Sequence, residues 1–180
     1  MKKIFAWMVL ISLASFFSMK AAAETAAGKG TSAKLSSLID DMKRSDQSAR
    51  IRAIDEIGKM GAEAKEALPL LVQALRDRDK SIRYQAAAAI GAIGPAAEEA
   101  VPALIRVLKD TDPVARQGAA WVLSKIGLGA KGAIPALSQA LRDNDRLVRV
   151  RAYSALQAIG TSEAPDASKR FWEVEARRDR

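Results

Sequence analysis

Apolar residues recur along this chain with helical spacing, and the helices themselves recur every 33 residues. In the segment 101–108, apolar residues occupy the first, fourth, fifth and eighth positions, which form one face of a helix. The segment 68–75 repeats this pattern, as does 134–141 with a serine at one of the four positions. An earlier copy at 35–42 has no proline. Each repeat is therefore predicted to begin with one helix, here called the first helix.

A second helix is predicted after a short polar turn in each repeat. In the third repeat, Asp112-Pro113 provides a helix-capping carboxylate and a proline suited to the first helical position. This helix should end at Gly127, where a positive φ is needed. Its expected buried residues are Ala115, Ala119, Ala120, Leu123 and Ile126, with Ile82, Ala86, Ala87, Ile90 and Ile93 one repeat earlier and Val148, Ala152, Tyr153, Leu156 and Ile159 one repeat later.

The 33-residue period is strict at positions that mark helix starts and ends. The residues that keep it are Asp46, Asp79, Asp112 and Asp145; Arg50, Arg83, Arg116 and Arg149; Gly61, Gly94, Gly127 and Gly160; and Pro69, Pro102 and Pro135. A fixed period of this length is typical of a solenoid, in which each repeat buries its apolar face against its neighbours. The predicted fold is all-α, an α-solenoid of about four stacked two-helix repeats with a C-terminal capping helix.

The second helix and its flanking residues resemble a known family. The segment 79–94 reads Asp-x-x-Ile-Arg-x-x-Ala-Ala-x-Ala-Ile-Gly-x-Ile-Gly, which is similar to the short HEAT-like repeats of phycobilin lyases. The segments 46–61, 112–127 and 145–160 are further copies, with Ser124 and Gln157 replacing one glycine in the last two. Ankyrin and tetratricopeptide signatures are missing from the sequence. The resemblance covers about residues 34–160 and implies stacked helix pairs.

The period and the composition together divide the chain. Residues 1–23 read as a signal peptide and 24–33 as a flexible leader rich in small residues. The solenoid is predicted over 34–160, with repeats at 34–66, 67–99, 100–132 and 133–160. Residues 161–180 are predicted to form a cap and tail in which Phe171, Val174 and Trp172 cover the fourth repeat, because a terminal repeat otherwise exposes its apolar face.

The repeated Asp–Arg pairs are the strongest candidates for a catalytic site in this sequence. Their i,i+4 spacing places both side chains on one side of a helix start. A catalytic site would be unique, whereas these pairs occur four times. We therefore expect the aspartate to cap its helix and the arginine to reach a neighbouring carboxylate or carbonyl, as the family resemblance also implies.

Partner contacts are expected where the repeats differ. The resemblance implies that second helices line a concave face, on which the fifth, sixth and ninth positions after each capping aspartate point outward. Tyr84 and Trp121 then fall in adjacent central repeats, and a Tyr/Trp pair near arginines has the composition of a binding hot spot. The predicted partner-binding residues are Tyr84, Gln85, Gln117, Trp121, Arg52 and Arg151. The sequence leaves open whether Trp121 contacts a partner or packs between repeats as core.

The N-terminus predicts export. Met1-Lys2-Lys3 precedes an apolar stretch from Ile4 to Phe17, and Ala21-Ala22-Ala23 follows as a cleavage signal. Cleavage is predicted after Ala23, which places the protein in the periplasm or outside the cell. The alternative is a retained anchor, although fourteen apolar residues are short for a helix that must span about 30 Å of hydrocarbon.

Composition narrows the function classes. The chain has neither histidine nor cysteine, which removes the commonest general base, the commonest metal ligand and the thiol nucleophile. No catalytic residue, metal or cofactor is predicted, and the protein is expected not to be an enzyme. The net charge of +8 falls to about +5 once Lys2, Lys3 and Lys20 of the signal peptide are removed, and it is spread along the chain. A solvated surface explains this charge, while contact with anionic lipid, polysaccharide or an acidic protein stays open. Nucleic acid is not expected as a partner of an exported protein.

These features predict an exported, monomeric binding module that holds an unidentified protein or peptide in its concave face. Two alternatives stay open at this stage. One is a lyase or chaperone-like factor for a tetrapyrrole, which the family resemblance suggests. The other is electrostatic binding to anionic envelope surfaces through basic residues of the convex face, such as Arg76, Arg106 and Arg142. Contact with a membrane is expected only through such surface charge or through an uncleaved signal peptide.

Overall fold

The structure is a computed structural model, and it describes residues 30–44, 46–160 and four residues of the tail, 169, 171, 173 and 176. Residues 1–37 and 38–180 form two separate units. In the first unit, residues 30–37 are helical, including four residues that the sequence places in the leader. The predicted signal peptide lies outside the described residues.

The second unit is built from helices that repeat every 33 residues. Helical residues 38–42 come first. They are followed by α2 (Gln47–Met60), η1 (Gly61–Ala67), α3 (Leu68–Ala74), α4 (Lys80–Ile93), η2 (Gly94–Ala100), α5 (Val101–Val107), α6 (Pro113–Ile126), η3 (Gly127–Ala133), α7 (Ile134–Ala140) and α8 (Arg146–Ile159). Every regular element among the described residues is helical, which confirms the predicted fold class.

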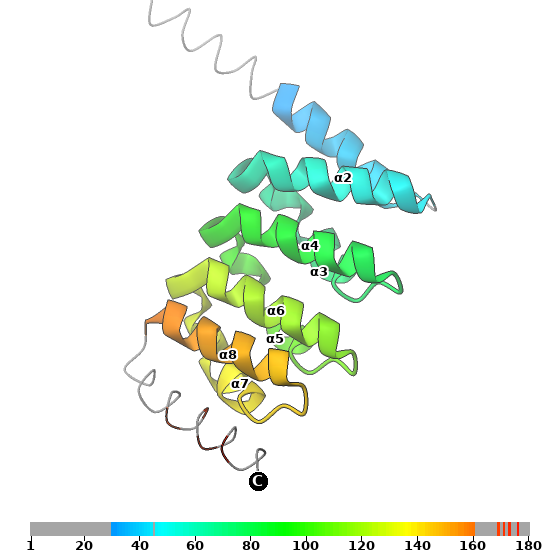
Figure 1. The fold of residues 1–180 in the computed structure, drawn as a ribbon. Coiled ribbons are helices and arrows are strands. Elements are labelled where there is room, and N and C mark those ends of the chain that lie inside the picture. The colour runs from blue at the N-terminus through cyan, green and yellow to red at the C-terminus, as the bar shows by residue number, and fades with distance from the viewer. Residues whose placement is uncertain are drawn as a thin grey trace, which may run out of the picture. The chain divides into compact units, whose positions relative to one another are not determined.

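The long helices form one layer and the short helices another. Figure 1 shows α2, α4, α6 and α8 stacked one on the next, with α3, α5 and α7 behind them. Each long helix packs against the long helices before and after it, whereas α3, α5 and α7 pack mainly against their own long partner and the 3-10 segments. The long helices are the predicted second helices, and their outer surface is called the second-helix face below.

The helix boundaries follow from capping and backbone geometry. The side chain of Asp79 accepts hydrogen bonds from the backbone N–H groups of Ser81 and Ile82 at the start of α4, and Asp46, Asp112 and Asp145 cap their helices in the same way. The glycine after each long helix has a φ between 56° and 66°, a conformation that other residues adopt at a cost. These predicted caps are therefore confirmed.

One 3-10 segment (η1, η2 or η3) connects each of α2, α4 and α6 to the short helix that follows it. The sequence analysis did not predict these segments. Their buried positions are alanines, such as Ala64 and Ala67 in η1. Short side chains allow the chain to turn tightly here while its apolar atoms still reach the core. Pro69, Pro102 and Pro135 then stand in the first turn of α3, α5 and α7, as predicted.

The core runs between the two helix layers. It contains the predicted faces of α4, α6 and α8, including Ile90, Leu123 and Leu156, none of which is measurably exposed. Tyr153 differs from the prediction, because it is half-buried and stacks on Phe171 of the tail with ring centroids 4.9 Å apart. Phe171 is itself buried, while the side chains of Trp172 and Val174 lie outside the described residues.

One apolar stretch, Lys80–Val107, has the length and composition of a membrane-crossing helix among the residues described. It consists of α4, η2 and α5, and the positive φ of Gly94 separates the first two. Ile82, Ile90 and Leu104 within it are buried in the core of the stack. Core packing is therefore sufficient to explain its apolar character.

Candidate partner-binding face

The second-helix face carries most of the exposed large apolar side chains that the structure describes. Tyr84 on α4 is 72% exposed. Val114 and Leu147 are also exposed, and they occupy equivalent positions in the first turns of α6 and α8. Only Leu128, after the end of α6, belongs to a different part of the described surface. Apolar exposure is thus gathered on three successive long helices, which is typical of a contact surface.

Trp121 lies partly on this face and partly against α4. Its side chain is half-buried, and its six-membered ring lies over Gly91, where an added Cβ atom would be only 2.5 Å from the ring. The ammonium of Lys125 lies 5.5 Å from the ring centroid, a cation–π distance. One portion of Trp121 therefore packs between repeats, as one of the two alternatives predicts, and another portion is accessible. Contact of that accessible portion with a partner stays a prediction.

A pocket of about 230 Å³ lies where α4 and α6 face each other on the second-helix face. It brings together four of the six predicted residues, which are Tyr84, Gln117, Trp121 and Arg151. Gln117 is fixed by the hydrogen bond that its Nε2 donates to Asp145, at 2.9 Å. The remaining lining residues are Arg83, Ala87, Ala88, Val114 and Gly118.

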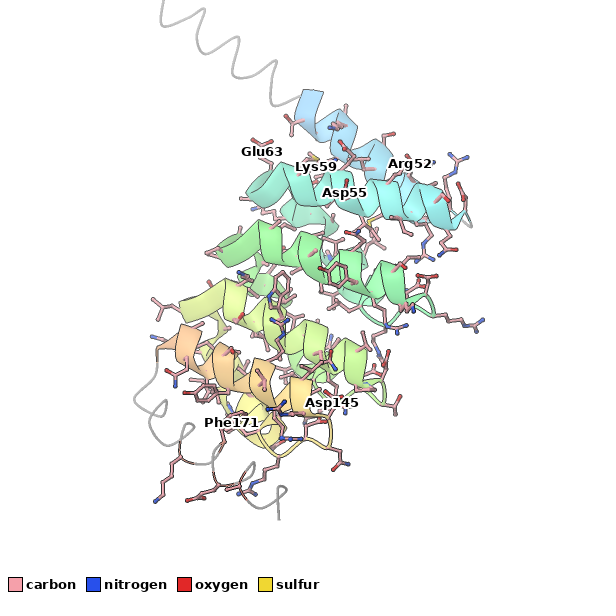
Figure 2. The ribbon with its side chains drawn as sticks, in the orientation of Figure 1. Arg52, Asp55, Lys59, Glu63, Asp145 and Phe171 are labelled. Atoms are coloured by element: carbon pink, nitrogen blue, oxygen red, sulfur yellow. The ribbon has the colours of Figure 1, made fainter. Side chains whose placement is uncertain are left out.

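The other two predicted residues lie outside this pocket. Gln85 lines a neighbouring hollow of about 210 Å³ between α2 and α4, together with Asp55 and Lys59. Arg52 is exposed and lines neither hollow. Figure 2 shows Arg52, Asp55 and Lys59 on α2, whereas the residues that line the Trp121 pocket belong to α4, α6 and α8.

At the α2 end of the face, three charged side chains of one helix pair with one another. Lys59 forms ion pairs with Asp55 at 2.8 Å and with Glu56 at 2.9 Å. Hydrogen bonds to these two carboxylates raise the pKa of Lys59 above its ordinary value. These three side chains therefore engage one another, while the exposed Arg52 lies outside their cluster.

The Asp–Arg pairs connect successive repeats and do not form a catalytic centre. Arg116 donates from Nε and one terminal nitrogen to the two carboxylate oxygens of Asp143, both at 2.8 Å. Its other terminal nitrogen donates to the carbonyls of Asp110 and Thr111. Arg50 pairs with Asp77 in the same way along the stack. The predicted structural role of the arginines is confirmed.

Arg83 follows this pattern with poorer alignment. Its Nε lies 3.0 Å from the Oδ2 atom of Asp112, which is close enough for an ion pair. The N–H does not point at that oxygen, so no hydrogen bond forms there. One terminal nitrogen donates to the carbonyls of Asp77 and Arg78 instead.

A second series of aspartates takes part in these contacts between repeats, which are called the Asp–Arg ladder below. The sequence analysis did not predict the role of these aspartates. Asp77, Asp110 and Asp143 stand two residues before the capping aspartates and also keep the 33-residue period. Each accepts a hydrogen bond from the backbone N–H of the capping aspartate that follows it. The 33-residue spacing of these three aspartates is the feature of the sequence that could have identified them.

The pKa values of these three carboxyls lie below the ordinary value. For Asp143, burial alone would raise the pKa, but hydrogen bonds from Arg116 and the backbone N–H of Asp145 outweigh it. The same opposition holds for Asp77, with Asp79 and Arg50 as donors. At Asp110 the backbone N–H of Asp112 is the main cause. All three are therefore charged at neutral pH.

A larger hollow lies elsewhere, between α3 and α5 in the layer of short helices. It measures about 620 Å³ and is lined mostly by apolar side chains such as Leu68 and Val72. Arg76 at its edge pairs with Asp110. This hollow marks the gap between two short helices that do not pack closely, and it contains none of the predicted site residues.

No cluster of three or more acidic side chains suited to a metal ion occurs among the described residues. The face offers aromatic side chains and arginine, which are residue types enriched at binding hot spots.

The sequence profile of HEAT repeats matches residues 33–124 and 68–157. Together these matches span most of the chain. The chain belongs to the HEAT-repeat family. No curated protein matches it.

Solved structures share the fold at low sequence identity. The complex of CpcE and CpcF of phycocyanin lyase from Nostoc sp. PCC7120 aligns with a TM-score of 0.57 and 21% identity, covering 80% of this chain and 89% of that one. A designed armadillo repeat protein in complex with the peptide (KR)4 gives 0.55 and 22%, covering 79% and 70%. An engineered protein gives 0.53 and 21%, covering 78% and 68%. These likenesses show the HEAT and armadillo type of solenoid, including the type found in phycobilin lyases.

Proposed function

We propose that this HEAT-repeat protein is a non-catalytic binding module that holds a partner protein or peptide on its second-helix face. The observation that carries the proposal is the pocket where exposed Tyr84, half-buried Trp121 and exposed Arg151 converge from three successive long helices. Tyrosine, tryptophan and arginine are the residues that most often dominate binding energy at protein interfaces.

The fold supports this role. One structural neighbour, a designed armadillo repeat protein, is in complex with a peptide, so a stack of helices of this kind can present a surface to an extended chain. The signal-like N-terminus supports export, and we propose that the partner is met in the periplasm or outside the cell.

The proposal is tested by affinity capture from the cell-envelope fraction with the full chain. The wild type is compared with a Tyr84→Ala/Trp121→Ala double variant and with Leu128→Ala, which removes an exposed apolar side chain outside the pocket. We expect the double variant to lose the partner, because hot-spot residues typically cost about 2 kcal/mol or more on truncation, while Leu128→Ala retains it. Equal recovery by all three proteins, each folded by circular dichroism, would contradict the proposal.

A further inference from the structure

The charges around the Trp121 pocket all have one sign. Arg83 and Arg151 are the charged residues among the described residues that line it. Arg83 is engaged by the carbonyls of Asp77 and Arg78 and by the carboxylate of Asp112. Arg151 is exposed and has no hydrogen bond or ion pair in the described part of the chain. The pocket therefore has one cation available to a ligand.

A second cation lies beside the same indole. Lys125 is exposed, and its ammonium is held over the Trp121 ring rather than in an ion pair with any described residue. An ammonium in this position keeps its hydrogen-bond donors directed toward solvent, since the ring face offers attraction but no conventional acceptor. A ligand that contacts Trp121 thus also comes near Lys125.

The nearest aspartates do not neutralise these cations. Asp112 caps α6 by accepting from the backbone N–H of Val114, and it also lies against Arg83. Asp145 accepts from the backbone N–H of Val148 and from Gln117. Both carboxylates keep their negative charge, but three cations, Arg83, Lys125 and Arg151, lie around the same pocket, so positive charge is in excess there.

Apolar surface extends from the pocket toward Arg151. Tyr84 and Val114 border the pocket, and both are exposed. Leu147 occupies on α8 the position that Val114 occupies on α6 and is 57% exposed. Arg151 follows Leu147 by four residues on the same helix, so these two side chains are neighbours on one side of α8.

We propose that the occupant of this pocket is an acidic segment of a partner protein that carries an aromatic or large aliphatic side chain between glutamates or aspartates. The apolar side chain enters between Tyr84 and Trp121, and a neighbouring carboxylate pairs with Arg151, whose planar guanidinium suits a carboxylate. A basic segment would instead bring like charge to Arg151 and Lys125. This inference rests on the binding role proposed above and specifies the chemistry of the partner.

The test uses three labelled peptides and the full chain, with binding measured by fluorescence anisotropy. The first peptide has a central phenylalanine between glutamates, the second has lysines in place of the glutamates, and the third has glycine in place of the phenylalanine. We expect the first peptide to bind and the other two to bind at least about ten-fold more weakly, which corresponds to about 1.4 kcal/mol.

Reversing the charge of Arg151 tests whether this side chain contacts the carboxylates of the peptide. Arg151→Glu should weaken the first peptide about ten-fold or more and strengthen the second, a gain that an unfolded variant could not produce. Arg142→Glu is the matched control, because Arg142 is an exposed arginine outside the pocket whose replacement changes the net charge equally. It should leave the affinity of the first peptide nearly unchanged.

Several outcomes would overturn the proposal. These are tighter binding of the lysine peptide by the wild type, an unchanged affinity of the first peptide for Arg151→Glu, association of the chain only with vesicles of anionic lipid, and a dimer that Trp121→Ala abolishes. If no peptide binds but capture still depends on Tyr84 and Trp121, the acidic chemistry fails and the binding role stands. If the first peptide binds equally to the Tyr84→Ala/Trp121→Ala variant, the proposed face itself is wrong.

Discussion

At the scale of single residues, one glycine determines how Trp121 is presented. Gly91 occupies the twelfth position after its capping aspartate, where the other repeats have Gly58, Ser124 and Gln157. The indole of Trp121 lies where any side chain at position 91 would begin. The absence of a Cβ atom therefore lets the ring pack directly against the backbone of α4.

Substitution of Gly91 by alanine should move the ring. The added Cβ would be 2.5 Å from Trp121, and the ring can swing away more easily than the helix can shift. Alanine also favours the helix by about 1 kcal/mol, which offsets part of the lost packing. We therefore expect a red shift of the Trp121 emission, obtained by difference from Trp121→Phe, with little change in the free energy of unfolding.

Gly118→Ala is the matched control. A Cβ atom there would contact Ala87 at 3.5 Å and Leu75 at 3.7 Å, which are ordinary packing distances. The variant should keep the wild-type emission and gain up to about 1 kcal/mol of stability. An unchanged spectrum in Gly91→Ala would show that Trp121 does not rest on Gly91.

At the scale of elements, hydrogen bonds to aspartate carboxylates stabilise the loops that precede the long helices. The loops before α4, α6 and α8 each contain two periodic aspartates, one that caps the next helix and one that accepts from an arginine or a backbone N–H. The side chains of Arg116 and Asp143 are only 15% and 13% exposed. Their bidentate pair therefore joins the start of α6 to the loop before α8 with little competition from water.

Arg116→Ala should destabilise the chain more than Arg76→Ala. The first change leaves the largely buried Asp143 carboxylate without its main partner, which costs about 2 kcal/mol. The second removes an arginine that is 65% exposed from Asp110, which is 10% exposed but keeps the backbone N–H of Asp112 as its main donor. A pair with an exposed partner contributes about 0–1 kcal/mol. Urea unfolding followed by circular dichroism measures both, and equal losses would show that the ladder does not join the repeats as described.

The elements were predictable to different degrees. The long helices, their aspartate caps and their closing glycines follow from the period and the apolar pattern, because caps and buried faces depend on local residue type. The 3-10 segments were not predicted, since an alanine-rich stretch such as 94–100 has no distinctive pattern. Pairs such as Arg116 with Asp143 join residues 27 positions apart, and only the stacking distance between repeats identifies them.

At the scale of the whole molecule, stacking assembles a site from side chains that are ordinary in their own helices. Tyr84, Trp121 and Arg151 were selected from sequence because they break the period, and the structure places them around one pocket. Gln85 and Arg52 satisfied the same criterion but lie elsewhere. Position within a repeat predicts which face a residue occupies, whereas the pocket depends on which small residues lie beside it, such as Ala87 and Ala88.

Acid should weaken the stack as a whole. The pKa values of Asp77, Asp110 and Asp143 are lowered in the folded state relative to an ordinary value near 4. The unfolded chain therefore binds protons first as the pH falls, so the stability from these groups is fully present above about pH 4 and is lost below it. The urea midpoint should decline as the pH drops below about 4.

Asp143→Asn provides the comparison for this acid response. The amide cannot ionise and accepts less strongly from Arg116, so the variant should be less stable at neutral pH and lose less stability in acid than the wild type. Parallel declines for the two proteins would mean that carboxyls other than Asp143 dominate the response.

The contact between Trp121 and Gly91 also limits how this array can grow. Gene duplication commonly lengthens solenoids by copying a unit, but a second copy of residues 100–132 would place its tryptophan over Ser124 of the first copy, where a Cβ atom occupies the space that Gly91 leaves free. In the present order, the residue at the corresponding position of α8 is the small Ser154. The third repeat is thus matched to the second, and a copy of it placed after itself would have to turn its indole away from the preceding helix, so the order of the repeats is part of what the sequence encodes.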